Sequence, residues 1–145
     1  MIRTSNLDKT LDFYVTKLGL MEVKRYENKE GKFTLVFLCA SEDYNDAKSS
    51  KTPLIEITYN WPNSEGVNEE LSVGRSFGHL AFRVKNIYEL CDKLMKNNIT
   101  IHRPPKDGYM AFIKSPESIS IELLQEGEPL KLKEPWISMN NIGVW

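Results

Sequence analysis

Four side chains in this sequence could bind a divalent cation or move a proton: His79, His102, Glu56 and Glu122. The two histidines are the only ones in the chain, and each glutamate is the single carboxylate of an apolar run. Because side chains alternate in direction along a strand, a glutamate between two large aliphatic residues points away from them. On composition alone either glutamate could simply face water, and a lone histidine is more often structural than a ligand.

An internal repeat relates the two halves of the chain at an offset of 80 residues. Asn6 and Asn86 stand at the N-cap positions of two amphipathic helices, and Glu89 could form a capping box with Asn86. Gly19 in the first half and an Asn-Asn pair in the second are the expected helix ends. The apolar stripe has the same spacing in both helices: Leu7, Leu11, Tyr14 and Val15, then Ile87, Cys91, Leu94 and Met95.

Each predicted helix is preceded by a short strand and followed by three more. The pattern is β-α-β-β-β twice, which predicts an α+β fold of paired βαβββ modules forming curved mixed sheets around a metal cleft. We expect a first module at 1–61 with its first strand truncated, a linker at 62–74, a second module at 75–125 and a tail at 126–145. The segment 41–52 is expected to be an exposed loop. The three later strands are predicted at 21–27, 32–40 and 54–60 in the first module, and at 99–102, 109–114 and 118–124 in the second.

The repeat places Glu56 and Glu122 at equivalent positions, each in the last strand of its module. If the modules pair about a pseudo-twofold axis, equivalent strands bring both carboxylates toward a shared cleft. Two glutamates and a histidine would make a nitrogen and oxygen site for a divalent metal. The same offset puts the counterpart of His79 two residues before Met1, so a fourth ligand is expected just upstream.

Composition excludes several other classes of function. The net charge is -1, so there is no general electrostatic case for nucleic acid or an anionic membrane. No apolar stretch is long enough to span a bilayer, and the N-terminus lacks a signal-peptide core, so we expect a cytoplasmic protein. Cys39 and Cys91 are expected to be buried free thiols. Trp136 and Trp145 are expected to pack on the same subunit or on a partner.

Several segments resemble glyoxalase I, a member of the vicinal oxygen chelate superfamily. They match in order along the chain to about residue 126. The Glu-x-Thr-Tyr-Asn-Trp run is fairly specific to glyoxalase I, whereas the paired βαβββ pattern marks only the wider superfamily. The matching segments are 6–14, 18–20, 54–61, 77–79 and 121–123.

The resemblance implies a homodimer with shared sites, each holding one divalent metal: nickel, cobalt or zinc. Glu56, His79 and Glu122 match metal-ligand positions of the family. The remaining family ligand, a His or Gln, has no counterpart in this chain. Positions that hold the glutathione part of the substrate are matched by Arg3, Asn60, Arg75 and Lys106, and an anionic tripeptide does need such cationic partners.

The reaction implied by the resemblance is isomerisation of the methylglyoxal-glutathione hemithioacetal to S-lactoylglutathione, in methylglyoxal detoxification. Glu122 would be the catalytic base, and Glu56 would hold the metal. One alternative is a non-catalytic protein of the same superfamily that binds a small anionic ligand. Another is a differently specialised member that transfers a thiol to an epoxide or cleaves a ring with oxygen. Asn60, Trp61 and the basic residues favour glutathione.

Overall fold

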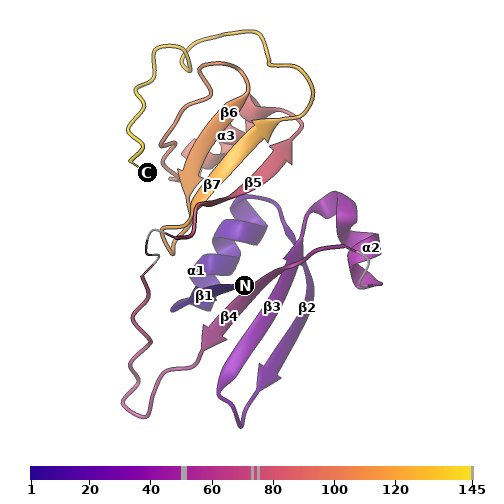
Figure 1. The fold of residues 1–145 in the computed structure, drawn as a ribbon, viewed down its shortest axis with the longest axis vertical. Helices are drawn as coiled ribbons and strands as arrows, with labels where there is room; N and C mark the ends of the chain where they lie inside the picture. Colours follow the sequence, from indigo (N-terminus) through magenta and orange to yellow (C-terminus); the bar gives the residue numbers. More distant parts are fainter. Residues whose placement is uncertain (50–51, 73, 75, 145) are drawn as a thin grey trace. The chain divides into compact units, whose positions relative to one another are not determined.

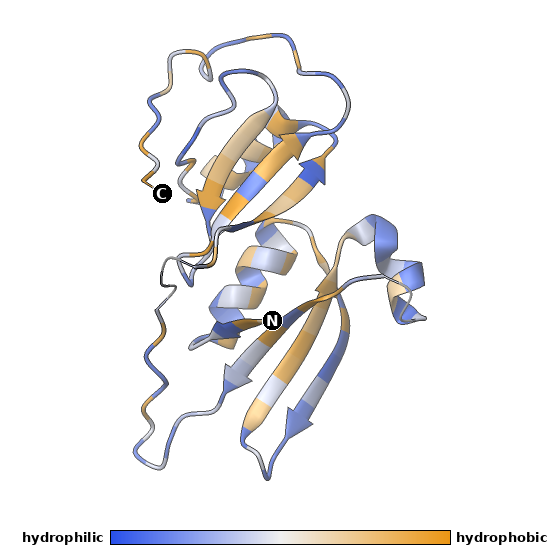
Figure 2. Ribbon diagram, viewed as in Figure 1, coloured by the Kyte–Doolittle hydropathy of each residue, from blue (hydrophilic) through white to orange (hydrophobic). Residues whose placement is uncertain are grey.

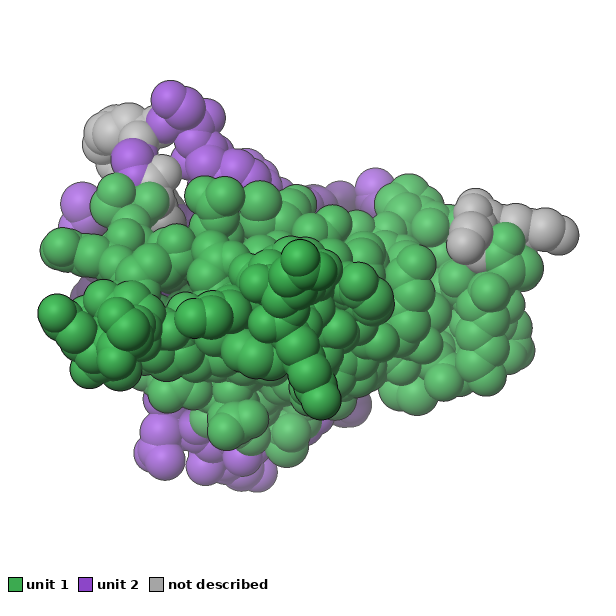
Figure 3. Space-filling model, turned by 90° about the horizontal axis from the view of Figure 1, so that it is seen from below, with its two compact units in different colours: residues 1–72 green, residues 73–145 purple. Residues whose placement is uncertain are grey.

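The structure is a computed structural model that describes residues 1–49, 52–72, 74 and 76–144. The chain divides into two compact units, Met1–Ser72 and Val73–Trp145. The two units are coloured separately in Figure 3. Each unit has its own sheet and its own principal helical segment (Figure 1).

Unit 1 contains a four-stranded mixed sheet in the order β1-β4-β3-β2. Strand β1 runs parallel to β4, and the other neighbours are antiparallel. The parallel pairing requires the chain to cross over between β1 and β2, and the crossover is helical. The elements are β1 (Ile2–Thr4), α1 (Leu7–Leu11), η1 (Asp12–Lys17), β2 (Met21–Asn28), β3 (Phe33–Cys39), η2 (Ser41–Asp43), α2 (Tyr44–Lys48) and β4 (Ile55–Asn60).

Unit 2 repeats this topology with three strands in the order β5-β7-β6. Strand β5 runs parallel to β7, and β6 runs antiparallel to it. The last strand is therefore central in both units, between a parallel and an antiparallel neighbour. The elements are β5 (His79–Val84), α3 (Ile87–Lys96), β6 (Met110–Lys114) and β7 (Ser120–Gln125).

Both helices begin at the predicted N-cap asparagines. The Asn6 side chain accepts a hydrogen bond from the Lys9 backbone N–H at 2.9 Å, and Asn86 accepts one from the Glu89 N–H at 3.2 Å. The expected capping box differs in one detail, because the Glu89 carboxylate accepts from the Asn86 side-chain amide at 2.8 Å. After its first turns the helix of unit 1 widens into the π-helical segment η1.

Two sequence predictions about elements were wrong. Residues 99–102 do not form a strand, and only an isolated bridge joins Arg103 to Phe112. Pro104 and Pro105 follow at once, and proline has no N–H to continue a ladder. The segment 41–52 contains η2 and α2 rather than only loop, and α2 is held down by the buried Ala47.

The core of each unit lies between one face of its sheet and its helix. In unit 2 the fully buried Ile113, Ile121 and Leu123 occupy that face, and Cys91 and Leu94 are buried on α3. The apolar residues along β6 and β7 appear as orange bands in Figure 2. Burial raises the pKa of the Cys91 thiol to about 12. Cys39 is buried as well, and both cysteines are free thiols, as predicted.

The segment after β7 packs on unit 2. Trp136 is 0% exposed and its ring stacks on Tyr88, with ring centroids 5.9 Å apart. The Leu130 N–H donates to the Gly108 carbonyl at 3.0 Å. Gly108 has a φ of 69°, and a Cβ there would come within 2.2 Å of the Leu130 oxygen, so only glycine fits. Trp136 therefore packs within its own chain, while Trp145 lies outside the described residues.

Within the described ranges, no helix is both long enough and apolar enough to cross a membrane.

Candidate active site

The face of the unit 2 sheet opposite its buried core carries the predicted histidine and glutamate. Along β7 the neighbours Ile121 and Leu123 are 0% exposed on the core face, whereas the Glu122 side chain is 16% exposed on the other face. The strand register places Phe112 of β6 opposite Glu122. It also places His79 of β5 opposite Ser120, on this same open face.

His79 and Glu122 meet on this face. The His79 Nε2 atom lies 3.2 Å from Oε2 of Glu122, which allows a hydrogen bond between the imidazole and the carboxylate. The ring of Phe112 stands edge-on to the imidazole, with ring centroids 5.5 Å apart and an angle of 82° between the planes. An imidazole nitrogen and a carboxylate oxygen at this separation could hold a cation between them or exchange a proton.

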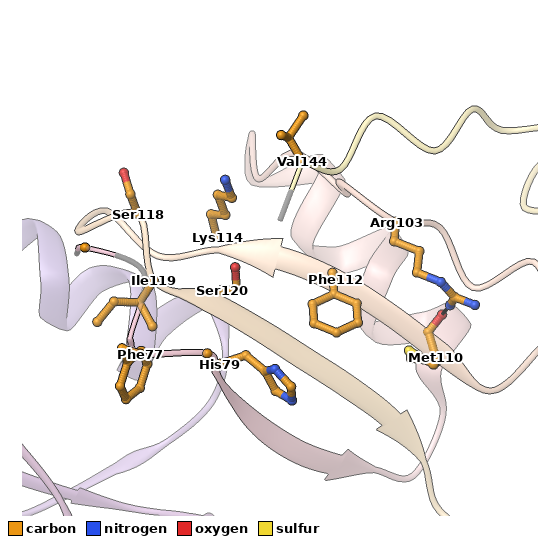
Figure 4. Close-up of a pocket in the computed structure, with 12 residues that line it drawn as sticks. Phe77, His79, Arg103, Met110, Phe112, Lys114, Ser118, Ile119, Ser120 and Val144 are labelled. Carbon is orange, nitrogen blue, oxygen red and sulfur yellow. Dashed lines mark hydrogen bonds between the residues drawn. The ribbon is translucent and has the colours of Figure 1, made fainter. Parts of the chain in front are cut away.

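His79 of this pair lines a pocket of about 510 Å³, whereas Glu122 is not among the lining residues. Figure 4 shows His79 and Phe77 on one side of the pocket, with Lys114 and Val144 on the other and Phe112 between them. The lining is mixed, because apolar side chains alternate with cationic and hydroxyl groups. The other lining residues are Gly74, Gly78, Arg103, Met110, Ser118, Ile119 and Ser120.

Two cations of the pocket were not among the predicted site residues. The Arg103 guanidinium donates to Oδ2 of Asp107 at 2.9 Å and also to the Met110 carbonyl, so its position is fixed. Partial burial opposes ionisation of Asp107, but the hydrogen bonds from Arg103 and from two backbone N–H groups outweigh it and lower the pKa of that carboxyl. Lys114 lies two residues after Phe112 on the same face of β6. That alternation with Met110 and Phe112 was the sequence signal that could have identified Lys114.

Glu56 occupies the corresponding position in unit 1. It lies on β4, which is central between a parallel and an antiparallel strand as β7 is in unit 2. Phe37 of β3 stands opposite Glu56, as Phe112 stands opposite Glu122. The Thr58 hydroxyl donates to Oε1 of Glu56 at 3.1 Å, which orients the carboxylate. The topological equivalence of the two glutamates is thus present in the strand register.

The other predicted residues are spread over both units. Arg3 is exposed on β1, opposite Thr58 in the register and so on the Glu56 face. The Asn60 side-chain amide donates to Oε1 of Glu69 at 2.9 Å. Lys106 is exposed in the turn before β6, and Arg75 lies outside the described residues.

His102 was a candidate from its residue type, but it does not line the pocket. Its backbone N–H donates to the Phe112 carbonyl at 2.8 Å, and its own carbonyl accepts from the Ile142 N–H at 2.9 Å. Burial and the nearby Lys114 ammonium lower the pKa of its imidazole. Its place in the structure is to connect backbone segments beside β6.

The donor types present suit a divalent metal, but one unit does not complete a site. His79 and Glu122 supply an imidazole and a carboxylate, which borderline cations such as zinc, nickel and cobalt accept. Across the described part of the chain, no three His, Cys, Asp or Glu side chains come together as a metal-binding group. A site with Glu56 as a further ligand would need the open faces of two sheets.

The chain matches the profile of the Glyoxalase/Bleomycin resistance protein/Dioxygenase superfamily over residues 1–123, and it therefore belongs to that superfamily. Within the superfamily it resembles the lactoylglutathione lyases. It is 37% identical over 130 residues to a probable lactoylglutathione lyase of Vibrio parahaemolyticus, covering 86% of each chain. It is 34% identical over 131 residues to the lactoylglutathione lyase of Neisseria meningitidis serogroup B, covering 87% of each chain.

The fold is shared with solved glyoxalase I structures. The trypanothione-dependent glyoxalase I of Leishmania major superposes with a TM-score of 0.72 at 30% identity, over 86% of this chain and 82% of that one. The resemblance seen in the sequence is thereby confirmed, and so is the α+β class with two modules of βαβββ type. In unit 2 the isolated bridge at Arg103 replaces the second strand of that pattern.

Proposed function

We propose that this protein is a metal-dependent lactoylglutathione lyase that isomerises the hemithioacetal of methylglyoxal and glutathione to S-lactoylglutathione. The observation that carries the proposal is the contact of His79 with Glu122 at 3.2 Å on the open face of the sheet, beside a pocket large enough for a small organic substrate. The similarity to lactoylglutathione lyases supplies the substrate class.

Glu56, His79 and Glu122 would hold the metal. Glu56 would come from unit 1, where its position is equivalent to that of Glu122 in unit 2. A bound divalent cation would stabilise negative charge on the substrate oxygens. We further propose that the sites are shared in a homodimer, as the resemblance to glyoxalase I implies.

Glu122 would act as the base at the reacting carbon. Its carboxylate accepts the proton from C1 of the hemithioacetal, the C–H electron pair forms a C1–C2 double bond, and the C2 carbonyl oxygen takes up the negative charge. Glu122 then returns the proton to C2, and the C1 hydroxyl proton passes to the C2 oxygen, which gives the thioester of the 2-hydroxy acid. His79 is placed to orient the Glu122 carboxylate, and the Phe112 ring shields one side of the imidazole from water.

The anionic glutathione part of the substrate would be held by cationic and amide side chains. Arg3, Asn60, Arg75 and Lys106 are the residues proposed from the family resemblance. In addition, Arg103 and Lys114 line the pocket beside the His79 and Glu122 pair. Ammonium and guanidinium groups in the lining of a pocket favour a carboxylate ligand.

The test is turnover of the methylglyoxal hemithioacetal by the Glu122→Gln variant in the metal-loaded protein. Gln keeps the shape of the side chain but cannot accept the proton, so kcat should fall about 100- to 10,000-fold, the usual contribution of a positioned base. Glu126→Gln is the matched control, because Glu126 is exposed just beyond the end of β7 and should leave kcat unchanged. Near-normal turnover by Glu122→Gln would overturn the assignment.

A non-catalytic protein that binds a small anionic ligand is the second candidate, and the observation that favours it is the presence of two cations, Arg103 and Lys114, in the pocket lining. Calorimetry with S-lactoylglutathione separates the two. Binding of that ligand without turnover by the metal-loaded wild-type protein would favour the second candidate over the lyase.

A further inference from the structure

The segment after β7 is fastened to unit 2 at three successive places, and the last of them lies beside the pocket. Leu130 donates to the Gly108 carbonyl at 3.0 Å, Trp136 stacks on Tyr88, and the Ile142 N–H donates to the His102 carbonyl at 2.9 Å. We call residues 126–144 the tail. Because it makes three separate contacts, the tail is part of the folded structure of unit 2.

The last anchor connects the tail to the residues that lie side by side across the sheet with Glu122. Glu122 is paired with Phe112, and Phe112 is joined by a β-bridge to Arg103. The carbonyl of the preceding residue, His102, then accepts the hydrogen bond from Ile142. The tail at Ile142 is thus the next backbone segment after the Arg103 bridge. It lies in the same line across the sheet as Glu122.

This arrangement brings Val144 to the rim of the pocket, two residues beyond the anchored Ile142. Figure 4 shows Val144 across the pocket from Phe77 and His79. Val144 is 78% exposed and Phe77 is 50% exposed, and both line the pocket, so each leaves apolar surface uncovered at its rim. Apolar surface at two places on the rim suits an apolar substituent, while Arg103 and Lys114 of the same lining would face the anionic part of the substrate.

We propose that the tail is a wall of the pocket and that Val144 is a specificity-determining residue for the apolar substituent carried by C2, the ketone carbon of the substrate. This inference rests on the proposed lyase function. A methyl substituent is too short to gain much from the wall, whereas an aryl or longer alkyl substituent would be covered by it. The tail would therefore favour larger 2-oxoaldehydes through KM, without taking part in proton transfer.

The experiment compares S-hexylglutathione with S-methylglutathione by calorimetry on the metal-loaded protein, so that it needs no turnover. The ratio of the two affinities measures how well the pocket covers an apolar group. Val144→Ala removes two methyl-sized contacts, so the preference for the hexyl compound should fall about three- to tenfold. The matched control Leu132→Ala changes an exposed tail residue that does not line the pocket, and should leave the ratio unchanged.

A second pair of variants tests the anchor. Ile142→Pro removes the N–H that binds the His102 carbonyl, whereas Ile142→Ala keeps it. Only the proline variant should reproduce the loss seen with Val144→Ala, and it should also speed hydrogen exchange at the neighbouring tail amides. In steady-state kinetics, Val144→Ala should raise KM for the phenylglyoxal hemithioacetal three- to tenfold and leave kcat and the methylglyoxal KM within about twofold.

The outcomes separate this inference from the function on which it rests. If wild type binds both S-alkylglutathiones and the affinity ratio is the same in every variant, the wall is refuted and the lyase proposal stands. If wild type binds neither compound and turns over neither hemithioacetal, both proposals fail together.

Discussion

Replacing Trp136 tests how the tail is held on unit 2. The side chain is 0% exposed and stacks on Tyr88, and Trp→Ala at such a site costs about 3–5 kcal/mol. Its indole N–H has no hydrogen-bond partner within the described residues, which costs wild type about 1 kcal/mol or more. Removing that penalty offsets part of the loss, so Trp136→Ala should lower the free energy of unfolding by about 2–4 kcal/mol.

Trp136→Phe is the matched variant. It keeps an aromatic ring over Tyr88 and removes the unsatisfied indole N–H, so its stability should lie within about 1 kcal/mol of wild type. Urea unfolding followed by far-UV circular dichroism measures both variants without relying on tryptophan fluorescence. Equal stabilities for the Ala and Phe variants would refute the reasoning, because they would mean that the stacked ring contributes nothing.

Four further outcomes are expected. A thiol reagent at pH 8 should leave Cys91 unmodified in the native protein and modify it after unfolding. Burial raises the pKa of the Cys91 thiol from 9.0 to about 12 in the folded protein, so the thiol of the unfolded chain ionises first as pH rises. The stability that this thiol contributes is therefore present below pH 9.0 and should be lost between pH 9.0 and about 12. Asn86→Ala should cost about 1 kcal/mol of unfolding free energy by removing the cap of α3, whereas Asn141→Ala in the tail should cost less. Light scattering should show a homodimer, and a stable monomer that binds metal tightly through both glutamates would contradict shared sites.

The parts of the fold set by local patterns could be predicted from the sequence. The N-caps at Asn6 and Asn86 and the opposed faces of Glu122 and its neighbours depend on residues at most four positions away. Periodicities of 3.6 and 2 carry that information directly. Gly19, with a φ of 94°, ends the first helix as expected.

The parts that depend on distant residues could not be predicted. Residues 99–102 have the composition of a strand, but the prolines after Arg103 stop the ladder and the tail takes the carbonyl of His102. Nothing local in the sequence shows that residue 142 will reach residue 102. Arg103 was missed as a pocket residue for the same reason, since strand pairing rather than spacing along the chain brings it to the pocket.

The strand order of unit 1 has a consequence for synthesis of the chain. Every strand of its sheet pairs with a strand of the same unit, from Ile2 of β1 to Asn60 of β4. Once β4 has left the ribosome, the whole sheet can close, although the residues of unit 2 have not yet been translated. The step that closes it, parallel pairing of the first strand with the last, joins distant residues and is the slow one. A nascent chain stalled just after residue 60 still has β4 inside the exit tunnel, so its first unit should be unfolded and sensitive to protease. When the stall site is moved far enough downstream to release β4, the first unit should become resistant to protease.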